Sequence, residues 1–185
     1  LPHEIGANSP LEALKAQAVI ARTWAIYNSN RFEADKFHLC VTTQCQVYKP
    51  QIVNDNIEKA IIETQNEVLV FEGKPINAFY HASNGGISAL SSESWKMSDY
   101  PYFTSEFDFI NFENKYLYPS IKQREELKYF LQRNRNNFFG KDHYLFRWKR
   151  TVSDKEILNL LQKNDLVNNN PKILDLKVIK RGVSG

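Results

Sequence analysis

Apolar residues recur every three or four positions over residues 10–27, the spacing of one face of a helix. Ser9 stands directly before Pro10, and Glu12 follows three residues after Ser9. This order is typical of a capping box with proline in the first turn. The pattern therefore predicts a long, capped amino-terminal helix, rich enough in alanine for another element to approach it closely.

A second helix and a β-hairpin are predicted after it. Residues 55–65 repeat at helical spacing, whereas residues 67–71 and 76–81 alternate like strands. The two alternating runs flank Glu72-Gly73-Lys74-Pro75, which is typical of a hairpin connection. The second helix is expected to bury Ile57, Ala60 and Ile61.

The carboxy-terminal half is predicted to add helices at residues 122–133 and 153–163, the latter opening with a Ser-x-x-Glu capping box, and a strand at 173–179. Residues 87–120 have no strong period. The predicted class is α+β, with the long amino-terminal helix packed on a mainly antiparallel sheet. No repeat or linker composition appears, so residues 1–185 are interpreted as one domain.

Composition and charge narrow the choice of partners. The chain has 185 residues, 42% of them hydrophobic, and no apolar run approaches the roughly 20 residues of a membrane helix. Nine Lys or Arg stand against three acids between Lys122 and Arg150, so this segment carries +6 and the remainder −3. A basic surface suits an anionic partner, and a plain solvated face is the alternative. No nucleic-acid recognition motif accompanies it, so nucleic acid is not expected as a partner.

Three segments in a fixed order carry a family resemblance. They are Pro2-His3-Glu4 ahead of residues 10–23, then Thr42-Thr43-Gln44-Cys45-Gln46-Val47-Tyr48, then residues 73–86 ending in Ser83-Asn84-Gly85-Gly86. Together they resemble the stage II sporulation protein D (SpoIID) family and its relatives, the LytB amidase enhancers. Weaker similarities are at Trp95, Pro101-Tyr102, Trp148 and Ser184-Gly185.

The resemblance covers most of residues 1–102 and, more loosely, residues 144–185. Family chains usually continue beyond the final Ser-Gly, and this chain opens without an initiator Met. The resemblance therefore implies one SpoIID-like domain truncated at both ends. It also implies a location outside the cytoplasm, with export or membrane anchoring through a missing amino-terminal segment.

The resemblance implies a peptidoglycan lytic transglycosylase with Glu4 as the catalytic residue. Cleaving the MurNAc–GlcNAc bond needs a proton delivered to the leaving oxygen through an oxocarbenium-like transition state. A single carboxyl group can act as general acid and then as base if the muramic acid's own 6-hydroxyl closes a 1,6-anhydro ring. His3 stands where the family often has Ser. Without the resemblance, Glu4 would be interpreted as an ordinary exposed carboxylate.

Amide, hydroxyl and aromatic side chains suit a saccharide ligand, because it offers many hydroxyl and N-acetyl groups. Arg22 is expected to meet the lactyl carboxylate of muramic acid, with an ion pair at the helix end as the alternative. For the Ser83–Gly86 segment the alternative is a plain turn. The expected substrate-binding residues are Arg22, Gln46, Tyr48, Ser83, Asn84, Gly85, Gly86 and Tyr102.

A cluster of soft ligands allows two interpretations. His38, Cys40 and Cys45 form a set from which a structural zinc site could be built, as in some family members. Gln44 stands where a histidine ligand would help, which leaves His81 as a distant fourth candidate. A Cys40–Cys45 disulfide is the rival, and an oxidising compartment permits it. Catalysis itself requires no cofactor.

A non-catalytic role is the alternative function. The amidase-enhancer relatives imply a peptidoglycan-binding module that assists another wall hydrolase. In that case, the basic segment and the aromatic residues grip wall polymer, and Glu4 is only a contact. The expected partners are glycan strands and, in this alternative, a cell-wall amidase or other wall hydrolase.

Overall fold

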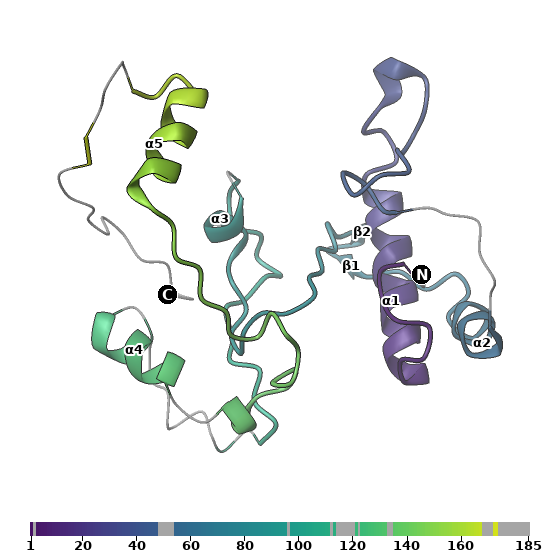
Figure 1. Ribbon diagram of the computed structural model, residues 1–185. Helices are drawn as coiled ribbons and strands as arrows, with labels where there is room; N and C mark the ends of the chain where they lie inside the picture. Colours follow the sequence, from purple (N-terminus) through teal and green to yellow (C-terminus); the bar gives the residue numbers. More distant parts are fainter. Residues whose placement is uncertain are drawn as a thin grey trace. The chain divides into compact units, whose positions relative to one another are not determined.

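The computed structural model describes residues 1, 3–47, 54–95, 97–111, 113, 121, 123–132, 135–167 and 172–173. The chain forms two compact units, Leu1–His81 and Ala82–Gly185 (Figure 1), which are described separately below. The sequence predicts one domain because no linker composition marks a boundary, and the structure places the division directly after His81. Helices and an antiparallel hairpin are both present, so the predicted α+β class is confirmed.

Helix α1 (Leu11–Tyr27) is the longest helix among the described residues, and the prediction of its extent is confirmed. The predicted capping box is wrong. Pro10 occupies the N-cap position with an extended ψ of 143°, and no side chain caps the helix. A capping Ser9 would need the helix to begin at Pro10, because the hydroxyl of an N-cap residue accepts a hydrogen bond from the backbone N–H two or three residues later. The helix begins at Leu11, one residue too late for this contact. Glu12 binds Lys15 Nζ at 2.8 Å instead.

Helix α2 (Asp55–Glu63) packs against α1 in the core of the first unit. Asn54 caps it by accepting the Ile57 N–H at 2.9 Å. Ile57 and Ala60 are fully buried as predicted, but Ile61 is 43% exposed, so its predicted inward orientation is wrong. The buried residue beyond the end of the helix is Thr64, whose hydroxyl donates to the Ala60 carbonyl at 2.8 Å.

The predicted hairpin is confirmed, with shorter strands and a tighter turn. Strands β1 (Val70–Phe71) and β2 (Lys74–Pro75) pair antiparallel and form the one sheet of the described residues. Glu72 and Gly73 both have positive φ, at 49° and 75°, as a two-residue hairpin turn requires. Lys74 and Pro75, predicted as part of the connection, therefore form the returning strand, which packs on α1.

A cluster of aromatic and aliphatic side chains forms the core of the second unit. Two isolated antiparallel bridges, Ile87 with Phe107 and Phe109 with Phe138, bring its segments together. The rings of Phe109 and Phe138 stack with centroids 5.0 Å apart. The fully buried members of the cluster are Ile87, Ile121, Phe130, Phe138 and Phe146.

The helices of the second unit are short. Within the described residues they are α3 (Ser91–Ser94), α4 (Arg124–Gln132), the 3₁₀ turn η3 (Arg135–Asn137) and α5 (Asp154–Lys163). The predicted capping box of α5 is confirmed, because the Ser153 hydroxyl accepts the Glu156 N–H and the Glu156 carboxylate accepts the Ser153 N–H. The strand predicted at 173–179 lies, beyond its first residue, outside the described residues.

Candidate functional site

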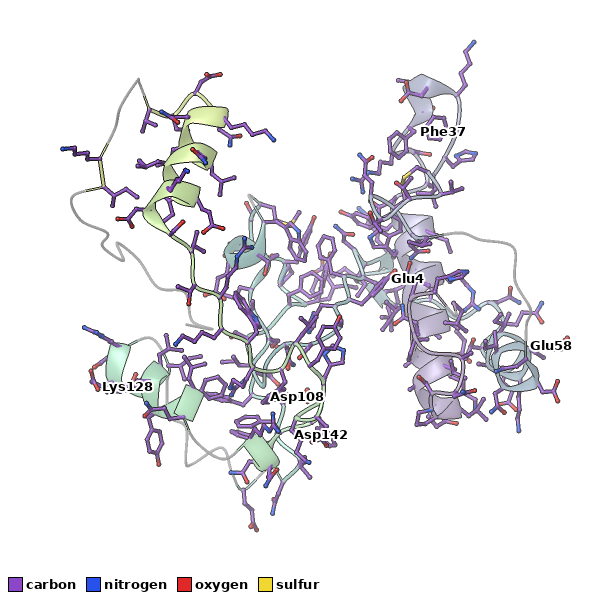
Figure 2. All side chains as sticks on the ribbon, in the orientation of Figure 1. Glu4, Phe37, Glu58, Asp108, Lys128 and Asp142 are labelled. Carbon is purple, nitrogen blue, oxygen red and sulfur yellow. A yellow bond between two sulfur atoms is a disulfide. The ribbon has the colours of Figure 1, made fainter. Side chains whose placement is uncertain are left out.

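Glu4 lies in a turn of the first unit that precedes α1 (Figure 2). The turn is closed by the Glu4 N–H, which donates to the Leu1 carbonyl at 3.0 Å, and is anchored because Ile5 packs on the core formed by α1 and α2. The Glu4 side chain is half-buried. Its Oε1 accepts the Val47 N–H at 2.9 Å, so a backbone amide from a distant segment fixes the carboxylate.

Tyr80 provides a second hydrogen bond to the Glu4 carboxylate. Burial raises the pKa of the Tyr80 phenol well above its ordinary value, and the charge of Glu4 and the hydrogen bond to it raise this pKa further. A weaker opposing contribution comes from a hydrogen bond with Gln46. The phenol therefore stays protonated and donates a hydrogen bond to the carboxylate, which orients Glu4 from a second direction.

Gln46 links this arrangement to the long helix. Its Nε2 donates to the Ala21 carbonyl of α1 at 3.1 Å, and its side chain also bonds to Tyr80. Since Val47 is the next residue, this anchor also positions the amide that binds Glu4. The amino-terminal turn, the Gln46-Val47 segment and Tyr80 thus meet at one carboxylate. Such a fixed, partly dehydrated carboxyl group can act as an acid or base toward a ligand.

Arg22 has a different environment from the one expected. Its Nη1 donates to the Thr64 carbonyl at 2.8 Å and to the Glu67 carbonyl at 2.7 Å. The guanidinium group therefore ties α1 to the chain that follows α2. These backbone contacts account for the position of Arg22 on the first unit, and its expected contact with a lactyl carboxylate stays a prediction.

The Ser83–Gly86 segment forms a hydrogen-bonded turn in the second unit. Asn84 Oδ1 accepts the Gly86 N–H at 2.8 Å, and Asn84 Nδ2 donates to Asp108 Oδ2 at 3.2 Å. Gly86 has a φ of 101°, and a Cβ there would lie 2.9 Å from Phe138 Cδ1. The turn is thus explained by packing in its own unit, and its expected role in binding substrate stays a prediction.

The remaining predicted site residues are distributed as follows. Tyr102 stacks on Tyr100 with ring centroids 5.1 Å apart, within the second unit. Tyr48 lies outside the described residues. Tyr80 was not predicted. A half-buried phenol needs a hydrogen-bond partner, but the alternation of residues 76–81 gives no indication of which partner that is.

Cys40 and Cys45 form a disulfide, and their Cα atoms lie 5.7 Å apart. The sequence allowed this disulfide as the alternative to a zinc site. Sulfur atoms bonded to one another are not available as thiolate ligands. His38 Nδ1 lies 2.8 Å from the Ser29 carbonyl, a contact in which the ring nitrogen donates. In the part of the chain that the structure describes, no group of three or more His, Cys, Asp or Glu could hold a metal ion.

Comparison with known proteins relates most of the first unit to a known protein family. The sequence profile of the stage II sporulation protein family matches residues 1–71, which include Glu4, α1, the disulfide and Val47. Residues 1–71 are thus similar to the stage II sporulation protein family. A second profile, described as a domain of unknown function (DUF8618), matches residues 89–185, just over half of the chain. Tyr80 and the Ser83–Gly86 turn lie between the two matched segments.

Two relatives extend the comparison. The chain is 40% identical over 108 residues to the amidase enhancer of Bacillus subtilis, covering 58% of this chain and 14% of that protein. It is 42% identical over 91 residues to an uncharacterised protein of Brachyspira hyodysenteriae, covering 46% of this chain and 24% of that protein. The chain thus spans a quarter or less of the length of these relatives. No solved structure matches it. Within the described residues, no helix has the length and apolar character to cross a membrane.

Proposed function

We propose that this chain cleaves the glycan strands of bacterial peptidoglycan outside the cytoplasm, as a lytic transglycosylase with Glu4 as its single acid and base. The observation that carries the proposal is the environment of Glu4. Its half-buried carboxylate is held by the Val47 amide and the Tyr80 phenol. This supports a reactive group rather than a solvated surface charge. The match of residues 1–71 to the stage II sporulation protein family supports a bacterial substrate.

The proposed reaction needs one carboxyl group. Protonated Glu4 gives its proton to the glycosidic oxygen as the bond to the muramic acid C1 breaks. The 6-hydroxyl of the same sugar then attacks C1, and Glu4 takes the hydroxyl proton, which restores the protonated acid. The products are a 1,6-anhydro-muramoyl end and a free GlcNAc 4-hydroxyl. Tyr80 and Val47 hold the carboxyl group in one orientation through both proton transfers.

Glu4→Gln tests this function. We expect the wild-type chain to release anhydro-muramoyl products from glycan strands without stem peptides, and Glu4→Gln to lose about 100-fold or more of that rate. Mass spectrometry of the released saccharides measures both. Glu12→Gln is the matched control, because Glu12 is an exposed carboxylate of the same unit whose partner among the described residues is Lys15. Product release by Glu4→Gln at the wild-type rate would exclude the proposal.

The similarity to an amidase enhancer supports a second candidate function. In this alternative, the chain binds wall glycan and stimulates a separate cell-wall amidase, and the fixed Glu4 carboxylate only contacts the sugar. The two functions differ in one measurement. Stimulation of a wall amidase equally by the wild-type chain and by Glu4→Gln, without anhydro-muramoyl products from either, favours the enhancer.

A further inference from the structure

The second unit contains a pocket that has no part in the arrangement around Glu4. Its volume is about 350 Å³, at the lower end of the range of ligand pockets and suited to one or two sugar units. The walls come from the Ser83–Gly85 turn, helix α4 and residues 145–148. The pocket lies outside the segment matched by the stage II sporulation protein family.

The floor of the pocket is apolar, and its rim carries an exposed indole. Ile87, Phe130 and Phe146 line the pocket and belong to the buried core, so they form a rigid, dry surface that suits a methyl group. Trp148 also lines the pocket, yet 75% of it is exposed to solvent. An indole so exposed is a suitable platform for the apolar face of a sugar ring.

A fixed positive charge completes the pocket wall. The Arg147 guanidinium lies 4.6 Å from the ring centroid of Phe130 and 4.4 Å from that of Phe146. Its Nη1 donates to the Phe146 carbonyl at 2.9 Å and to the Gly85 carbonyl. These contacts hold the cation in place before any ligand arrives. Lys149 and Arg150, which follow Trp148, are exposed and add positive charge nearby.

We propose that this pocket binds an N-acetylmuramoyl unit of a glycan strand. The acetamido methyl meets the apolar floor, the pyranose ring stacks on Trp148, and the lactyl carboxylate faces the exposed cations Lys149 and Arg150 that follow Trp148. The buried Arg147 guanidinium adds its charge from within the pocket wall. The proposal rests on the proposed function only in taking peptidoglycan as the ligand. It adds a second sugar-binding site, independent of Glu4, which holds a glycan strand on the protein.

Titration of the 185-residue chain with free N-acetylmuramic acid tests the proposal. We expect the sugar to shift the indole N–H signal of Trp148 in NMR spectra, and Trp148→Ala to weaken binding about tenfold. Tyr144→Ala is the matched control, because Tyr144 is 79% exposed and does not line the pocket. N-acetylglucosamine lacks the carboxylate, so we expect weaker binding, and added salt should reduce the difference between the two sugars.

Two results would overturn the proposal. One is binding of N-acetylmuramic acid by Trp148→Ala with wild-type affinity, and the other is equal affinity of the wild-type chain for both sugars. Repeating the titration with Glu4→Gln separates this inference from catalysis. If the wild-type chain releases no anhydro-muramoyl product but the preference for N-acetylmuramic acid persists, transglycosylation fails and the binding site stands.

Discussion

Single polar side chains of the first unit serve mainly to satisfy backbone groups of distant segments. The buried Thr23 hydroxyl accepts the Leu69 N–H at 2.9 Å and donates to the Val19 carbonyl at 2.7 Å. Arg22 and Gln46 likewise bind carbonyl groups. Glu4 differs, because two donors from separate segments converge on a carboxylate. At the scale of the residue, this convergence is what distinguishes a candidate catalytic group from a structural one.

Tyr80→Phe should lower the rate of strand cleavage about tenfold, because Glu4 loses one of the two hydrogen bonds that orient it. The aromatic ring stays in place, so the melting temperature should change little. Release of anhydro-muramoyl products measures the rate. Tyr144→Phe removes an exposed hydroxyl elsewhere and should leave the rate unchanged. If both variants cleave at the wild-type rate, Tyr80 does not position Glu4.

Gly86→Ala should destabilise the second unit through both backbone strain and crowding. The residue has a φ of 101°, and the added Cβ would lie 2.9 Å from Phe138. Gly140→Ala is the control, since Gly140 has a φ of 68° but open space around it. We expect Gly86→Ala to lose about 1–3 kcal/mol more than Gly140→Ala in urea unfolding. Equal losses would mean that Phe138 moves aside without cost.

At the scale of the element, local signals located the helices but did not fix every helix end or every buried side chain. The Ser153 capping box was predicted correctly because every partner lies within four residues. The predicted Ser9 capping box does not form, because Pro10 is extended and the helix begins one residue later. The Glu12 carboxylate forms an ion pair with Lys15 instead. Ile61 lies four residues after Ile57, the spacing of a core residue, yet its side chain is exposed and Thr64 is buried instead. The spacing of apolar residues does not show how far around a helix the neighbouring element covers its surface.

The segment from Cys40 to Val47 makes the geometry of Glu4 dependent on a disulfide. The Cys40–Cys45 bond closes a short loop directly before Gln46 and Val47, the residues that bind Tyr80 and Glu4. Replacing both cysteines with serine should therefore reduce cleavage severalfold, and it should also destabilise the first unit by about 2 kcal/mol, because the disulfide no longer constrains the unfolded chain. Release of anhydro-muramoyl products and urea unfolding measure the two effects.

The control for this prediction is chemical. A reducing agent should slow the wild-type chain to the rate of the double Cys→Ser variant and have no effect on that variant. Cleavage by the reduced wild-type chain at its original rate would show that the loop holds its shape without the disulfide.

At the scale of the whole molecule, the sequence indicated the α+β class and the similarity of the first unit to the stage II sporulation protein family, whereas its composition marks no boundary between the two compact units. Only the alternative, non-catalytic function has the aromatic residues grip wall polymer, and in the second unit Phe130, Phe138 and Phe146 form part of a buried core. That core depends on the pairing of Ile87 with Phe107 and of Phe109 with Phe138. Such non-local pairs leave no period in the sequence, so neither the boundary at His81 nor the pocket beside Trp148 could be predicted.

Each of the two units has its own hydrophobic core, so we expect each unit to unfold independently of the other. Leu14 is fully buried between α1 and α2, so Leu14→Ala should cost the first unit about 2–5 kcal/mol. Hydrogen exchange should then speed up at the amides of α1 and α2. Protection should persist at the Ile110 and Phe139 amides, which bond across the second unit at 2.9 and 3.0 Å. Equal loss of protection in both units would show that the chain unfolds as one cooperative domain, as its uninterrupted composition suggests.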